Sequence, residues 1–113
     1  MTDVLDRIIR VREIRAAQAL AELGRAQARV NAEAALLARV STLRIGQYQG
    51  VAAAGAAKAR ARADVMLGKL AGDIADRLAN NTAFAAEQAQ SLARARAAVD
   101  AAIARRAERE ELP

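Results

Sequence analysis

The sequence predicts an all-α fold: a long antiparallel two-helix coiled-coil hairpin, formed by the whole chain of 113 residues. Three observations lead to this prediction. Apolar residues recur every three or four positions over two long segments, as in a heptad pattern. Three of the six glycines fall within the uncharged stretch 46–55 between these segments, and glycine favours the ends of helices. The one proline is Pro113, so no proline interrupts either segment.

The first segment predicts a helix over about residues 3–46. Thr2 or Asp3 can cap its first turn, because either side chain accepts a hydrogen bond from an early backbone N–H. Arg12 interrupts the main apolar seam, and further apolar rows widen the stripe at both ends of the segment. A wide stripe indicates a second neighbour there. The seam comprises Leu5, Ile9, Ala16, Leu20, Leu23, Ala26, Val30, Ala34, Leu37 and Val40, and the extra rows are Val4, Ile8 and Val11 at one end and Leu36 and Leu43 at the other.

A turn is predicted over about 46–55, followed by a second helix over about 56–110. Gly68 and Gly72 have the four-residue spacing that lets another helix approach closely. The stretch Asn80-Asn81-Thr82 leaves an alternative open, because a break there would give a three-helix bundle. Asn81 and Gln88 fall near the second seam, which comprises Leu67, Leu70, Ile74, Leu78, Ala85, Leu92, Ala95, Val99 and Ile103.

The composition argues against an enzyme. The chain has neither cysteine nor histidine, which excludes thiolate metal sites and histidine acid–base chemistry. Paired carboxylates need a desolvated cleft to separate their pKa values, and a two-helix hairpin offers none. We therefore expect no catalytic residue, no cofactor and no metal.

No apolar run approaches the ~20 residues that span a bilayer, so we expect a soluble, cytoplasmic protein.

The positive charge is concentrated around the predicted turn. The net charge is +5, yet residues 24–70 contain eight basic residues against Glu33 and Asp64. The positive charge of this half of the hairpin predicts an acidic partner. The alternative is that these side chains only form a solvated surface. Towards the C-terminus, Arg105 and Arg106 have glutamates at helical spacing and are expected to pair with Glu108 and Glu110. No aromatic residue lies near them, so nucleic-acid binding is not expected.

Several short stretches resemble the FliJ and YscO family of flagellar and virulence-associated type III export proteins. The first is Arg-Val-Arg-Glu at 10–13, followed by small and leucine spacing through Ala17, Leu20 and Ala28. Tyr48 stands near the turn. Residues 66–74, Met-Leu-Gly-Lys-Leu-Ala-Gly-Asp-Ile, are similar to the family's block that opens the return helix, and 93–97 to its Ala/Arg-rich closing segment.

The resemblance implies a non-enzymatic stalk and chaperone of bacterial flagellum biogenesis or type III secretion. It links an export ATPase (FliI-like) ring to an export gate protein (FlhA-like), and export substrates or their chaperones are further partners. The membrane would be reached only through these partners. The implied gate-facing residues near the turn are Leu37, Ser41, Tyr48, Met66, Leu70 and Arg77. The residues assigned to the ATPase-facing terminal end are Ile8, Val11, Arg12, Arg105 and Arg106.

Two other classes of function stay open from the sequence. A generic coiled-coil adaptor or dimeric scaffold would have the same seams, and a basic nucleic-acid or anionic-membrane binder would use the same arginines. Nucleic-acid binding would show a steep salt dependence, and membrane binding would need one helix with a basic and an apolar face. A stalk would instead co-purify with a ring ATPase.

Overall fold

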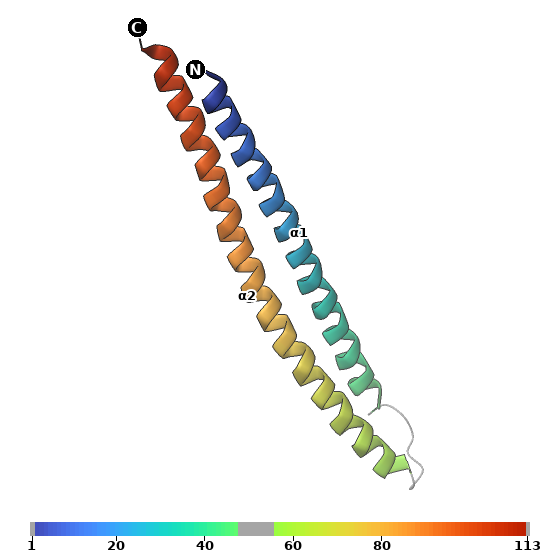
Figure 1. Cartoon of the computed structure of the whole chain (residues 1–113). Coiled ribbons are helices and arrows are strands. Elements are labelled where there is room, and N and C mark those ends of the chain that lie inside the picture. The colour runs from blue at the N-terminus through green and yellow to red at the C-terminus, as the bar shows by residue number, and fades with distance from the viewer. Residues whose placement is uncertain (1, 48–55, 113) are drawn as a thin grey trace. The chain divides into compact units, whose positions relative to one another are not determined.

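Over residues 2–47 and 56–112 the chain forms two helices. The computed structural model describes residues 2–47 and 56–112. Helix α1 spans Thr2–Gln47 and helix α2 spans Ala56–Glu111 (Figure 1), so that Leu112 alone of the described residues is not helical. The all-α fold class and the helical hairpin are confirmed. Neither of these helices, within the described residues, is long and apolar enough to cross a membrane.

The helix limits differ from the predicted turn at one edge. Gly46 and Gln47 still belong to α1, whereas the rest of the predicted turn, including Tyr48, lies outside the described residues. Helix α2 runs without a break through residues 80–82, so the three-helix alternative is wrong. The reason is local: the Thr82 hydroxyl donates a 2.7 Å hydrogen bond to the Leu78 carbonyl one turn earlier, so it is bonded within the helix instead of capping a new one.

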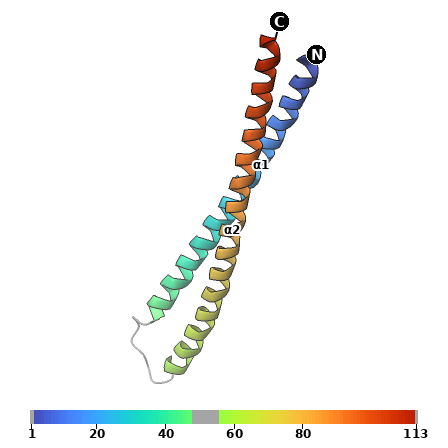
Figure 2. The same cartoon turned by 90° about the vertical axis from the view of Figure 1, so that its left-hand side faces the viewer.

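Packing divides the chain into two compact units, each made from both helices. We call Met1–Gln27 with Ala83–Pro113 the terminal unit, and Ala28–Thr82 the turn unit. In each unit α1 and α2 lie side by side and run in opposite directions, as both views show (Figures 1 and 2). The ion pairs between the helices agree with this antiparallel arrangement. In the terminal unit Asp6 meets Arg106, and in the turn unit Arg44 meets Asp64.

The buried residues follow a strict alternation of three-residue and four-residue steps. On α1 the seam runs through positions 5, 9, 12, 16, 19, 23, 26, 30, 33, 37, 40 and 44, all buried or half-buried. On α2 it runs through 60, 64, 67, 71, 74, 78, 81, 85, 88, 92, 95, 99, 102 and 106. This is the a and d pattern of a heptad repeat. The described hydrophobic residues with at most 6% of their surface exposed are Ile9, Ala26, Val40, Ile74, Leu92 and Ala102.

Four predicted seam residues were wrong. Leu20, Leu70 and Ile103 are 51%, 42% and 40% exposed, and Ala34 is exposed as well. The error has one cause, because the more apolar of two neighbouring residues was preferred each time: a leucine or isoleucine over an alanine, and Ala34 over Glu33. The heptad period instead selects the neighbours, which are Ala19, Ala71, Ala102 and Glu33.

All three charged seam positions of α1 have partners on α2. The Arg12 guanidinium donates a 2.8 Å hydrogen bond to the Ala98 carbonyl. Glu33 accepts a 3.2 Å bond from Arg77, and Arg44 bonds Asp64 at 3.1 Å. Arg12 therefore does not interrupt the seam as predicted; it belongs to the seam and is satisfied by the opposite backbone. Asn81 and Gln88 are half-buried seam residues too.

The predicted close helix approach at Gly68 and Gly72 is wrong. A Cβ added to Gly72 would meet nothing within 4 Å, and at Gly68 the nearest atoms belong to the Arg44 guanidinium, at 3.5 Å. Gly68 thus leaves room for an arginine tip beside Asp64, which lies one turn earlier on α2. No helix backbone approaches either glycine closely, because both lie outside the seam of positions 64, 67, 71 and 74.

The core predicts a large effect for Ile74→Ala. Ile74 has no exposed surface, so truncation should lower the free energy of unfolding by about 2–5 kcal/mol. Leu70→Ala, one turn away and 42% exposed, is the matched control and should change stability far less. Urea titration followed by circular dichroism measures both. Equal losses for the two variants would show that the seam is misplaced.

Glycines in open space should be replaceable with a gain in stability. A Cβ at Gly24 or Gly72 meets nothing within 4 Å, and glycine inside a helix is destabilising by about 0.5–1 kcal/mol relative to alanine. Gly24→Ala and Gly72→Ala should therefore each raise the melting temperature. A lower melting temperature in the isolated protein would mean that something in the fold does pack against that glycine.

Candidate interaction surfaces

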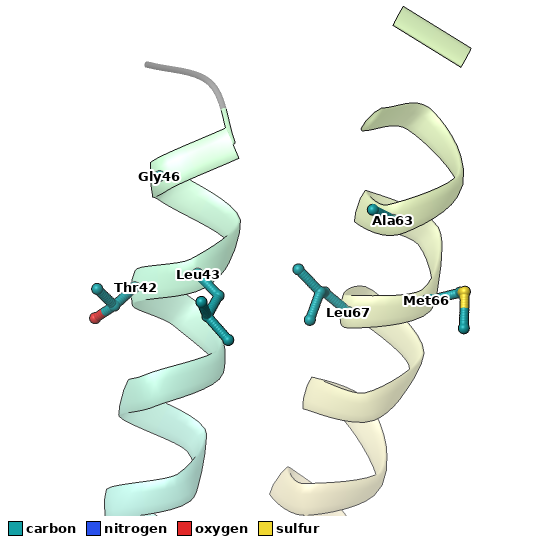
Figure 3. Close-up of a pocket in the computed structure, with 6 residues that line it drawn as sticks. All are labelled: Thr42, Leu43, Gly46, Ala63, Met66 and Leu67. Carbon is teal, nitrogen blue, oxygen red and sulfur yellow. The ribbon is translucent and has the colours of Figure 1, made fainter. Parts of the chain in front are cut away.

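The turn unit has an apolar groove between the end of α1 and the start of α2. Thr42, Leu43, Gly46, Ala63, Met66 and Leu67 line it. Leu67 points from α2 towards α1, whereas Met66 points away from α1 (Figure 3). Leu43 is 60% exposed and Met66 is 70% exposed. Large apolar side chains exposed in one place are typical of a surface that binds another molecule.

The helix segments that form this groove also carry exposed basic side chains. Arg39, Lys58, Arg62 and Lys69 are exposed, and the nearest carboxylate in the sequence, Asp64, is bonded to Arg44 through both of its oxygens, at 3.1 and 3.4 Å. The ion pair neutralises that carboxylate, so these segments keep a net positive charge. A partner that fits has an apolar surface flanked by acidic groups.

The structure brings some of the predicted gate-facing residues together and separates others. Met66 and Leu70 are exposed on α2, and Met66 lines the groove. Leu37 is a half-buried seam residue, and Ser41 is exposed on the other side of the α1 seam from Leu43. The Arg77 guanidinium forms an ion pair with Glu33. Tyr48 lies outside the described residues.

The terminal unit has two grooves on one side of its helix pair. An apolar groove at the chain ends is lined by Val4, Leu5, Ile8, Arg105, Glu108, Arg109 and Leu112. A basic groove further along is lined by Arg12, Arg15, Ser91, Arg94, Ala95 and Ala98. Both sets occupy the positions that flank the seam on the same side, since 8 and 15 on α1 and 91, 98, 105 and 112 on α2 are each seven residues apart.

Some of the residues predicted to face the ATPase are exposed, and others are bonded to the opposite helix. Ile8 and Val11 are 36% and 47% exposed, and Arg105 lines the apolar groove. Arg12 is held against the Ala98 carbonyl. The expected helix pair of Arg106 with Glu110 is wrong, because the Arg106 guanidinium instead bonds Asp6 across the two helices at 3.1 Å. Arg106 occupies a seam position, from which the opposite helix is nearer than the next turn.

Sequence reasoning missed Thr42, Gly46, Ala63 and Leu67 as groove residues and missed Arg15, Ser91 and Arg94 as a cluster. The apolar row at Leu36 and Leu43 was a usable signal for the first groove, because it stood outside the seam. The basic cluster gave no comparable signal. Its members come from two helices, so that only the antiparallel register brings positions 12–15 beside positions 91–98.

One half-buried carboxylate is incompletely satisfied. The Oε1 atom of Glu33 accepts from Arg77, whereas Oε2 is buried and has no hydrogen-bond partner within the described protein. A buried polar atom without a partner is destabilising.

Over residues 2–47 and 56–112, no group of three or more His, Cys, Asp or Glu side chains is placed to hold a metal ion.

Comparisons with known proteins give no identification: no protein-family model, no curated protein and no solved structure matches this chain.

The Glu33–Arg77 pair predicts opposite effects for its two members. Glu33→Leu removes a poorly satisfied carboxylate from a seam position and should raise the free energy of unfolding by about 1 kcal/mol or more. Arg77→Ala leaves that carboxylate without its cation and should lower the melting temperature. Thermal unfolding of both variants measures the signs. A loss of stability in Glu33→Leu would show that the carboxylate is well satisfied in solution.

Proposed function

We propose that this chain is a non-enzymatic helical-hairpin interaction protein that joins two protein partners, and that it serves as the stalk of a flagellar-type export apparatus. In this role the terminal unit engages the export ATPase ring and the turn unit binds the export gate protein. The observation that carries the proposal is the apolar groove of the turn unit, with Leu43 and Met66 exposed on helix segments rich in basic residues.

The difference in charge between the units supports two distinct partners. The turn unit, residues 28–82, holds eight basic and four acidic residues, a net charge of +4. The terminal unit, residues 1–27 and 83–113, holds ten basic and nine acidic residues, a net charge of +1. A protein with two partners needs two chemically different surfaces, because each surface must reject the other's partner.

The sequence resemblance supplies the identity of the partners, and the site chemistry is compatible with it. Met66 and Leu70 are assigned to the gate by the resemblance, and both are exposed on α2. Ile8 and Val11 are assigned to the ATPase and are accessible in the terminal unit. Each of these side chains is available to a partner without unfolding the helix pair.

Replacing the exposed groove residues should weaken gate binding selectively. The double variant Leu43→Ser, Met66→Ser removes two apolar side chains that are more than half exposed, so the fold should survive. If they are anchors, affinity for the purified cytoplasmic part of the gate protein should fall by more than about tenfold, while affinity for the ATPase stays unchanged. Isothermal titration against each partner separately measures this.

Val65→Ser is the matched control, since Val65 is 57% exposed and adjacent to Met66 but does not line the groove. It should leave both affinities intact. Equal weakening towards both partners in the double variant would indicate unfolding, which circular dichroism detects. Unchanged gate binding in a folded double variant would contradict the proposed role of the groove.

A further inference from the structure

The terminal unit exposes an apolar row beside its seam. Val4, Ile8 and Val11 are 60%, 36% and 47% exposed, and their spacing of four and three residues places them along one side of α1. From Val4 to Val11 the row extends about 10 Å along the helix. Leu112, 70% exposed, lines the same groove from α2. Within the described part of the terminal unit these four side chains therefore keep between 36% and 70% of their surface exposed.

Charged groups on α2 continue this face in a particular order. Arg94 lines the basic groove together with Arg15, and Glu108 lines the apolar groove. The spacing of 94, 101 and 108 is two heptads, so these positions share one side of α2. Arg15, Arg94 and Glu108 are exposed, and none of the three has an ion-pair partner in the part of the chain that the structure describes.

The apolar row and the charges are centred at nearly the same level. Arg12 contacts the Ala98 carbonyl and Asp6 contacts Arg106, so residues 6–12 of α1 lie level with residues 98–106 of α2. The row on α1 is centred between residues 7 and 8. Ala101 stands midway between Arg94 and Glu108, level with residues 9–10 of α1, which is within one helical turn of the centre of the row.

We propose that this face of the terminal unit binds the same face of a second copy of the chain, in a two-fold dimer with the copies antiparallel. Such an interface joins identical surfaces, so it needs a surface complementary to itself. Turning the face end over end about the level of Ala101, which is also the level of residues 9–10 of α1, places Val11 beside Ile8 of the second copy. The same operation places Glu108 of each copy at Arg94 of the other.

The basic groove accommodates that carboxylate. Its floor consists of small side chains, Ser91, Ala95 and Ala98, and Arg15 and Arg94 stand around it. Arg12 is fixed by its bond to the Ala98 carbonyl, so part of the positive charge is already in position. The dimer thus combines a central apolar contact with two symmetry-related charge pairs, which set direction and register more than affinity.

The dimer goes beyond the proposed function and does not depend on it. It covers Ile8 and Val11, which the stalk role assigns to the ATPase. If both proposals hold, dimerisation and ATPase binding exclude each other. The test below uses this protein alone, so its outcome is independent of whether any export protein binds.

Sedimentation equilibrium of charge-reversal variants tests the interface. Arg94→Glu and Glu108→Arg each create two like-charge contacts in the dimer and should raise its dissociation constant by about tenfold or more. An equal mixture of the two variants restores both pairs in a heterodimer, so the mixture should associate more tightly than either variant alone. Arg96→Glu, about 200° round the helix from Arg94, is the control and should associate like the unmodified protein.

A second pair of substitutions tests the apolar contact. Val4→Gln with Val11→Gln replaces exposed side chains and should abolish dimerisation without loss of helicity, whereas Val65→Gln, similarly exposed in the turn unit, should not. An unmodified protein that stays monomeric throughout the micromolar range would overturn the proposal. A dimer that ignores both the charge reversals and the Val4 and Val11 changes would overturn it equally, because it would use another face.

Discussion

A pair of helices shares a core only one stripe wide, and this constraint governs the rest of the hairpin. Each helix can bury the a and d positions of its heptads and little else. Many of these positions hold alanine, which favours the helix but contributes little apolar area. Ile74, with no exposed surface, is the largest of the side chains that are almost completely buried. Such a core aligns two helices without strongly preferring one register.

Polar side chains within the seam supply the missing preference. Arg12, Glu33 and Arg44 each occupy a seam position, and each has a partner on α2. A slip by one heptad would move all of these partners by about 10 Å and leave half-buried charges without compensation. Polar seam residues commonly fix register at some cost in stability. In this chain the loss of stability arises at the Oε2 atom of Glu33, which is buried without a hydrogen-bond partner.

The sequence was sufficient for the fold class because helix periodicity and glycine placement are local properties. It misassigned seam positions where Leu20, Leu70 and Ile103 compete with a neighbouring alanine, since hydrophobicity and period disagree there and the period decides. It also misjudged Gly72 and the partner of Arg106, because both depend on which residues the opposite helix presents. The two groove sites depend on the register between helices as well, and residue spacing along one helix does not determine that register.

The antiparallel register of the seam is the claim on which the charge partners, the grooves and the dimer face all depend. It can be measured by disulfide formation in a chain that has no natural cysteine. Ser41→Cys would be combined in turn with Ala61→Cys, Gly68→Cys and Ala75→Cys, which are one heptad apart beside the α2 seam and leave every seam residue in place. The account predicts that the intramolecular disulfide forms fastest with position 68. A maximum at 61 or 75, or disulfides that form only between chains, would contradict it.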